Sequence, residues 1–137
     1  MNSVRMHIGV DVGKNCLDIC FPDGKKEHLK NNKPGRARII HAAKKLDAIV
    51  CFEATGIYEE DLANECLAAG VRAARLDAWK TRQYAKSRGR IEKTDRLDCE
   101  MIRDFASSLE DGKMPFVKPR SAAHSLIKEY AKISSSL

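Results

Sequence analysis

The apolar segment at residues 48–52, Ala-Ile-Val-Cys-Phe, constrains the fold more than any other feature of the sequence. It shows no alternation of apolar and polar residues, which is typical of a strand buried on both faces in the centre of a parallel sheet. Glu53 ends this strand directly before Ala-Thr-Gly. The segment therefore predicts an α/β fold in which a carboxylate lies at the carboxyl end of a central strand.

The segments on either side complete an α/β pattern. Alternating residues predict a three-stranded β-meander at about 6–12, 17–21 and 27–30, with a turn at Pro-Asp-Gly 22–24. Helices are expected at about 34–46 and 57–69, the second with Tyr58 on its apolar face and Gly70 as its stop. A short strand follows at 71–76. The order is that of a mixed sheet of about five strands flanked by helices.

Two further helices are expected after the last strand. Asp77 can cap a basic helix at about 78–87, and Thr94 or Asp95 can cap another that runs to about Leu109. The tail after Gly112 contains two prolines and ends in Ser-Ser-Ser-Leu, which is typical of a linker. We therefore expect a catalytic domain at 1–112 and a linker or tail at 113–137.

Four acidic residues stand out by their positions. Asp11 lies inside a predicted strand, where aspartate is disfavoured, and Glu53 lies at a strand end. Asp95 and Asp98 are three residues apart, which places them on one face of a helical first turn. Each acid also has a purely structural alternative. Asp11 could accept turn hydrogen bonds, Glu53 could cap the following helix, and Asp95 could be an N-cap with Asp98 favourably placed against the helix dipole.

Taken together, the four acids favour a cation site. Burying several unpaired carboxylates at one edge of a core costs several kcal/mol per ion, and a divalent cation offsets that cost. Oxygen ligands without His or Cys favour magnesium or manganese over zinc. Two such ions held by carboxylates catalyse in-line attack on a phosphodiester.

The positive charge is concentrated in one segment. Residues 80–96 hold seven bases and two acids, which is +5 of the chain's net charge of +6. This distribution favours a polyanionic partner, bound through its phosphates, although a solvated surface helix is the alternative. The candidate nucleic-acid-binding residues are Lys80, Arg82, Lys86, Arg88, Arg90, Lys93 and Arg96.

Composition excludes several classes of protein. A chain of 137 residues fits one domain, and no apolar run approaches the roughly 20 residues of a membrane span. No long apolar stretch follows the N-terminus, so no signal peptide is expected. The five cysteines are scattered without a CxxC pair, which argues against zinc and suits a reducing compartment. We therefore expect a cytoplasmic protein without a membrane partner.

Three strings carry a resemblance to a known family. They are GVDVGKNCLDICF, CFEATGIYEEDLANECLAAG and GRIEKTDRLDCEMIRDFA, in this order along about residues 6–110. They resemble the N-terminal DEDD domain of the "one-ten" insertion-sequence transposases, a family that includes the Piv-type DNA invertases. That domain is similar to the Holliday-junction resolvase RuvC. On this match the family's four acids correspond to Asp11, Glu53, Asp95 and Asp98.

The resemblance implies a ribonuclease-H-like, RuvC-like α/β fold and a magnesium- or manganese-dependent site. It implies cleavage and strand transfer of DNA in transposition, with a guide-like noncoding RNA and a homo-oligomeric full-length protein. It also implies a C-terminal domain with a serine nucleophile, so this chain is expected to be an excised domain or a truncated product. The segment Asp77-Ala78-Trp79 departs from the Asn-Pro pair expected there.

Three other functions fit parts of the sequence. A stand-alone junction resolvase would use the same metal chemistry on branched DNA, and a non-catalytic nucleic-acid-binding remnant would bind without cutting. A phosphate-binding ATPase of the sugar-kinase and actin type shares a loop like 11–14, Asp-Val-Gly-Lys. Those ATPases clamp a nucleotide between two domains, and one loop in 137 residues does not provide that arrangement.

Overall fold

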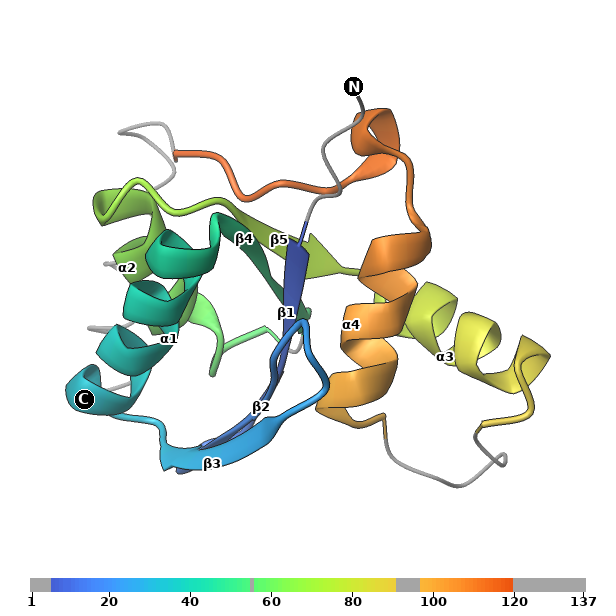
Figure 1. Cartoon of the computed structure of the whole chain (residues 1–137), viewed down its shortest axis with the longest axis horizontal. Coiled ribbons are helices and arrows are strands. Elements are labelled where there is room, and N and C mark those ends of the chain that lie inside the picture. Colours follow the sequence, from blue (N-terminus) through green and yellow to red (C-terminus); the bar gives the residue numbers. More distant parts are fainter. Residues whose placement is uncertain (1–5, 55, 91–96, 120–137) are drawn as a thin grey trace, which may run out of the picture.

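A five-stranded mixed sheet forms the centre of the protein, in a computed structural model that describes residues 6–54, 56–90 and 97–119. The strand order is β3-β2-β1-β4-β5 (Figure 1). Neighbours β1, β2 and β3 pair antiparallel, whereas β4 pairs parallel with both β1 and β5. The fold is the predicted ribonuclease-H-like α/β arrangement. The strands are β1 (Met6–Val12), β2 (Cys16–Cys20), β3 (Lys26–Lys30), β4 (Ala48–Glu53) and β5 (Ala73–Leu76).

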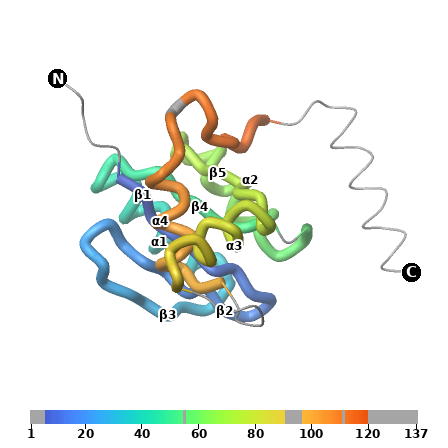
Figure 2. Tube along the Cα trace, turned by 90° about the vertical axis from the view of Figure 1, so that its right-hand side faces the viewer, coloured from blue at the N-terminus to red at the C-terminus, as the bar shows by residue number. Residues whose placement is uncertain are grey.

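Helices cover both faces of the sheet. Figure 1 shows α1 and α2 on one face and α4, with α3 beside it, on the other. Figure 2, turned by 90°, shows α3 and α4 in front of the sheet. The described helices are α1 (Lys33–Leu46), α2 (Glu60–Ala68), α3 (Ala78–Ser87) and α4 (Cys99–Ser108), followed by the short 3-10 helix η1 (Asp111–Lys113).

The side chains of β4 point alternately into two apolar cores, which explains why the strand is apolar throughout. Val50 and Phe52 belong to the core beneath α1 and α2, which includes Leu62 of α2. Ile49 and Cys51 point to the opposite face, where they form a second core that includes several apolar residues of α4. Because successive side chains of a strand point to opposite faces, a strand between two helical layers needs apolar residues at every position.

Helix α4 lies directly on β1, and Gly9 makes this approach possible. A Cβ atom at Gly9 would lie 2.1 Å from the carbonyl oxygen of Cys99 and 2.8 Å from the Cβ of Arg103. Further along, Ser107 Oγ lies 3.2 Å from His7 Nδ1. Cys99 is therefore level with Gly9 and Ser107 with His7, so α4 runs antiparallel to β1.

Arginine side chains fasten α4 to its neighbours. Arg103 donates a hydrogen bond of 2.9 Å to the carbonyl oxygen of Phe21, at the turn between β2 and β3. Arg90, which follows α3, donates to Glu100 at 2.9 Å and also to Asp104. Burial acts to raise the pKa of Asp104, but the hydrogen bonds from Arg103 and Arg90 outweigh it and hold that pKa below its ordinary value.

The prediction of helix 57–69 is wrong at its first turn, because α2 begins at Glu60. Gly56 has a left-handed backbone with φ +106°, and its N–H donates to the Glu59 carboxylate at 2.9 Å. This turn occupies the residues before the helix. Tyr58, predicted on the apolar face, is 44% exposed. The predicted stop at Gly70 is confirmed by its left-handed φ of +73°.

The chain after η1 returns to the edge of the sheet. Phe116 forms a β-bridge with Ala74 of β5, and the N–H of Val117 donates to the carbonyl oxygen of Ala73 at 2.8 Å. The stretch expected to begin a linker therefore includes residues that pack against β5. None of the described helices combines the length and the apolar character needed to cross a bilayer.

The close approach at Gly9 predicts a large effect of a single methyl group. Gly9→Ala should destabilise the protein by at least about 1–3 kcal/mol, because α4 must move away from β1. Thermal denaturation followed by circular dichroism should show a melting temperature lower by several degrees. Gly112→Ala is the matched control, since an added Cβ there meets no atom within 4 Å. Equal melting of the two variants would contradict the packing role of Gly9.

The low pKa of Asp104 predicts a pH-dependent contribution to stability. A carboxyl group with a depressed pKa stabilises the fold above its ordinary value, about 3.9, and this contribution is lost as the pH falls through the lower folded value. Asp104→Asn should therefore cost about 1 kcal/mol at pH 7, and progressively less below pH 4 in acid titrations of unfolding. Glu110→Gln, an exposed carboxylate after α4, is the control. A deficit that stays constant down to pH 2 would contradict the ion-pair origin.

Candidate functional site

The parallel strands bring two of the predicted acids to one edge of the sheet. Glu53 is the last residue of β4, and Asp11 is the last but one of β1. The register between the two strands ends with the pair of Val10 and Phe52, and Asp11 and Glu53 are the next residue of each strand. Paired residues of adjacent strands point to the same face. Gly9 and Cys51, two residues earlier, lie on the α4 face, so Asp11 and Glu53 are on the α4 face too.

Asp98 reaches the same region from the helical layer. It is the N-cap of α4, and its Oδ1 accepts a hydrogen bond of 2.8 Å from the N–H of Met101. Asp98 and Asp11 line one pocket of about 350 Å³. Because α4 runs antiparallel to β1, its N-terminus lies at the end of β1 that carries Asp11. Two acids far apart in the sequence are thus brought together by the tertiary structure.

The prediction that Asp95 and Asp98 share the first turn of one helix is wrong. Helix α4 begins at Cys99, and Asp98 has an extended backbone with φ −104° and ψ 172°. The Asp98 carboxylate binds the helix N-terminus, which is the geometry of a cap and not of a helical residue. The proposed caps Thr94 and Asp95 lie outside the described residues.

Four polar residues that line this pocket were not predicted from the sequence: Asp18, Lys26, Glu27 and His28. Asp18 lies directly opposite Asp11 on β2, and His28 lies opposite Asp18 on β3. His28 Nδ1 is 2.5 Å from Asp18 Oδ1. Like charges directly opposite each other destabilise a sheet, so this imidazole, or a cation, is a natural partner for the two aspartates. The alternation of Leu17 and Ile19 indicates which face Asp18 occupies, but the strand register was needed to place it beside Asp11.

The chemistry of the donors fits a hard divalent cation better than a soft one. The predicted ligands offer carboxylate oxygens, as magnesium and manganese prefer. Burial raises the pKa of the nearby Cys99 thiol to about 11, so in the metal-free protein it is protonated at neutral pH. Among residues 6–54, 56–90 and 97–119, no three His, Cys, Asp or Glu side chains lie close enough together to hold a metal ion. Asp95, the fourth predicted ligand, is outside these ranges.

The basic segment begins at the same edge of the sheet. Leu76, which ends β5, pairs with Glu53, and α3 starts two residues later behind its Asp77 cap. Of the predicted nucleic-acid-binding residues, Lys80, Arg82 and Lys86 lie on α3, Arg88 caps its C-terminus and Arg90 follows. The Arg88 guanidinium stacks over the Tyr84 ring at 5.2 Å, and Arg90 is bound to the carboxylates of α4. Lys93 and Arg96 lie outside the described residues.

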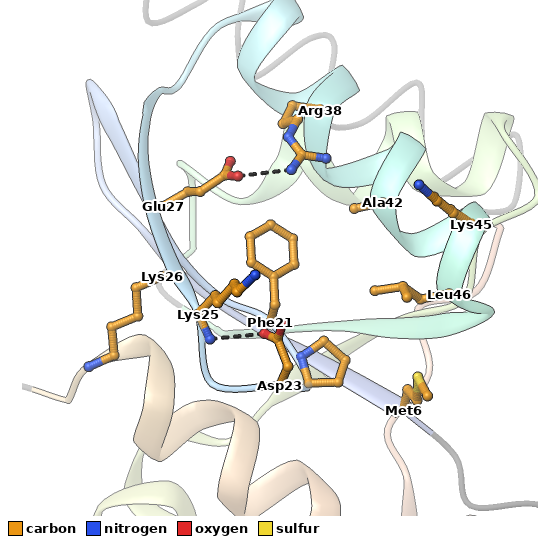
Figure 3. A pocket seen from close by; sticks show the side chains of 11 residues that line it. Met6, Phe21, Asp23, Lys25, Lys26, Glu27, Arg38, Ala42, Lys45 and Leu46 are labelled. Carbon is orange, nitrogen blue, oxygen red and sulfur yellow. Dashed lines mark hydrogen bonds and ion pairs between the residues drawn. The ribbon is translucent and has the colours of Figure 1, made fainter.

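A second, larger pocket of about 770 Å³ lies between α1 and the turn that joins β2 to β3 (Figure 3). Phe21 lies on its floor, with the Arg38 guanidinium 5.4 Å from the ring centre and paired with Glu27 at 2.8 Å. Met6, at the start of β1, also lines it. The parallel strands begin at this end of the sheet, opposite the edge that carries the acids. Its lining, within the described part of the chain, includes none of the predicted site residues.

Comparisons with known proteins assign the family. A solved structure of T. thermophilus RuvC in complex with a Holliday junction substrate is similar to this chain with a TM-score of 0.46 and 16% sequence identity, over 75% of this chain and 92% of that one. No curated protein matches the sequence. The family model of IS110-type DEDD transposases, described as a transposase, matches residues 8–137. Since the match spans nearly the whole chain, this protein belongs to the IS110-type DEDD transposase family.

Proposed function

We propose that this domain catalyses metal-dependent cleavage and strand transfer of DNA during transposition. Asp11, Glu53, Asp95 and Asp98 would hold Mg²⁺ or Mn²⁺. The observation that carries the proposal is the pocket that Asp11 and Asp98 line together, with Glu53 at the end of the adjacent strand β4. Membership of a transposase family supports DNA as the substrate.

The electrostatics of the sheet edge support a cation there. Asp11 and Asp18 face each other on adjacent strands, and Asp98 projects into the same pocket. Four carboxylates line this pocket against one lysine and one histidine, so they repel one another, and a divalent cation reduces this repulsion. When bound, such ions stabilise charge on the attacking and leaving oxygens of a phosphodiester. The cap hydrogen bond uses Asp98 Oδ1, so Oδ2 is the atom available to turn toward a cation.

The chain's own residues would position the substrate. Lys80, Arg82 and Lys86 on α3 would contact phosphates of the DNA strand and direct it to the carboxylate edge, where α3 begins. Arg90 contributes less directly, because its guanidinium holds Glu100 and Asp104 and so fixes the end of α3 against α4.

A guide-like noncoding RNA would choose the DNA target, and the full-length protein would act as a homo-oligomer. The five cysteines are all free thiols, which suits action in the reducing cytoplasm.

The dual role of Asp98 predicts different effects of two substitutions. Asp98→Asn keeps a good N-cap while removing a negative charge, so the metal-free protein should melt at the same or a higher temperature. Asp98→Ala loses the cap as well, at a cost of about 1 kcal/mol. Both variants should lose most of the increase in melting temperature that millimolar Mg²⁺ gives the wild type.

Asp77→Asn is the matched control for this experiment. Asp77 caps α3 as Asp98 caps α4, its Oδ1 accepting from the N–H of Lys80 at 2.9 Å. This variant should keep the full stabilisation by Mg²⁺. If Asp98→Asn responds to Mg²⁺ as strongly as Asp77→Asn does, Asp98 is a structural cap and not a metal ligand.

Direct cleavage tests the proposed reaction. With Mg²⁺ or Mn²⁺ the protein should nick branched DNA, and Asp11→Asn or Glu53→Gln should lower the rate more than about 100-fold, since even residues that only orient metal ligands cost 10–100-fold when mutated. Asp47→Asn is the control, because Asp47 is an exposed residue in a left-handed turn that asparagine also tolerates. Gel assays of labelled strands measure the rates. Cleavage that persists in EDTA, or in the Asp11 and Glu53 variants, would contradict the proposal.

A further inference from the structure

The only tryptophan of the chain is exposed on the basic helix. Trp79 lies in the first turn of α3, and 68% of its surface is accessible. Large aromatic side chains contribute most to stability when they are buried, and tryptophan is highly buried on average. Residues at α3 positions 81 and 85, in contrast, are fully buried against the protein. The packing of α3 therefore explains its small residues Thr81 and Ala85 but leaves Trp79 without a role in the core.

The position of Trp79 connects it to the carboxylate edge. Leu76, which pairs with Glu53, precedes Trp79 by three residues. Three residues span at most about 11 Å even when fully extended. The indole is therefore carried by the first turn of the helix that starts beside the proposed cleavage site.

The surroundings of Trp79 on α3 are basic. Gln83 and Lys86 follow it at spacings of four and seven residues, and all three side chains are exposed, so they form one solvent-facing stripe. Residues 78–90 contain five bases and no acid. An exposed aromatic ring can be covered by protein or by nucleic acid, and the charge of this helix favours a polyanion.

We propose that Trp79 stacks against an unpaired base of a DNA strand whose phosphates α3 holds. This inference rests on the proposed function, because it takes DNA as the substrate. Every base has a flat face that can stack on an aromatic ring, so the contact requires no particular sequence. Bases inside a duplex already stack on their neighbours, so Trp79 favours single-stranded or distorted DNA. The cations supply attraction to phosphates, and the indole distinguishes unpaired from paired strands.

The unique tryptophan provides its own spectroscopic signal. Titration of the protein with oligothymidylate should quench its tryptophan fluorescence to saturation, whereas duplex DNA of the same length should quench it weakly. Trp79→Ala should weaken binding of labelled oligothymidylate by about 5- to 150-fold, measured by fluorescence anisotropy. Trp79→Phe should restore part of this loss, and Leu46→Ala, at the opposite end of the sheet, should have no effect.

Salt dependence separates stacking from phosphate contacts. Stacking releases no counterions, so Trp79→Ala should lower affinity at every salt concentration without changing the slope of log affinity against log salt. Lys86→Ala should instead flatten that slope by about one unit. A loss of slope in Trp79→Ala would mean that the substitution disturbs the basic helix, and would overturn the stacking assignment.

Three further results would overturn the inference: unchanged affinity of Trp79→Ala for oligothymidylate, equal affinity of the wild type for single-stranded and duplex DNA, or tighter binding of single-stranded RNA than of DNA. Failure of the stacking role is distinguishable from failure of the proposed function. Stacking is scored by binding without metal, whereas the proposed function is scored by cleavage with metal in the Asp11 and Glu53 variants. Weaker binding by Trp79→Ala, together with selective quenching by single-stranded DNA, would support the stacking role of Trp79.

Discussion

The contact of α4 with β1 at Gly9 determines the geometry of the whole carboxylate edge. Without a side chain at Gly9, the helix backbone comes so close that an added Cβ would lie 2.1 Å from the Cys99 carbonyl oxygen. This contact, together with that between Ser107 and His7, determines where α4 lies along β1 and in which direction it runs. Asp98, one residue before the helix, is thereby placed in the pocket of Asp11. A helix held farther from the sheet would separate these two acids.

The acidic residues of α4 and of its N-cap have two different roles. Glu100 and Asp104 are paired with Arg90, and Asp104 with Arg103 as well, so these two acids contribute to stability. Asp98, at the N-terminus, instead caps the helix and faces the pocket. The same arginines tie α4 to the end of α3 and to the turn between β2 and β3. Glu100 and Asp104 are thus neutralised by ion pairs within the fold, whereas Asp11 and Asp98 line the pocket proposed to bind a cation.

The basic and acidic features of the domain share one edge because of the sheet topology. Strands β1, β4 and β5 are parallel, so their carboxyl ends carry Asp11, Glu53 and the start of α3 at the same level. This edge is where ligands bind in open α/β sheets. The larger pocket around Phe21 lies where these strands begin, and its described lining includes none of the predicted site residues, although Lys26 and Glu27 line both pockets. The proposed roles of the carboxylates and of Trp79 both follow from this single edge.

Local patterns in the sequence were sufficient to predict the elements themselves. The apolar segment before Glu53, the alternation in β1 and β2, the stop at Gly70 and the cap at Asp77 each depend on neighbours within a few residues, and the structure confirms them. The resemblance of three sequence strings extended this to the family and the ribonuclease-H-like fold.

Only the tertiary structure decided the relations between distant segments. The local sequence predicted Thr94 or Asp95 as the cap of the last helix, whereas the cap of α4 in the structure is Asp98. The pairing of Asp18 with Asp11 and His28 depends on strand register. The position of α4 along β1 depends on a close contact between residues some 90 positions apart. Periodicity and capping act over a few residues, so a sequence displays them directly. Register and helix-to-sheet distance are set by how whole surfaces fit together, and that information appears only once the chain has packed.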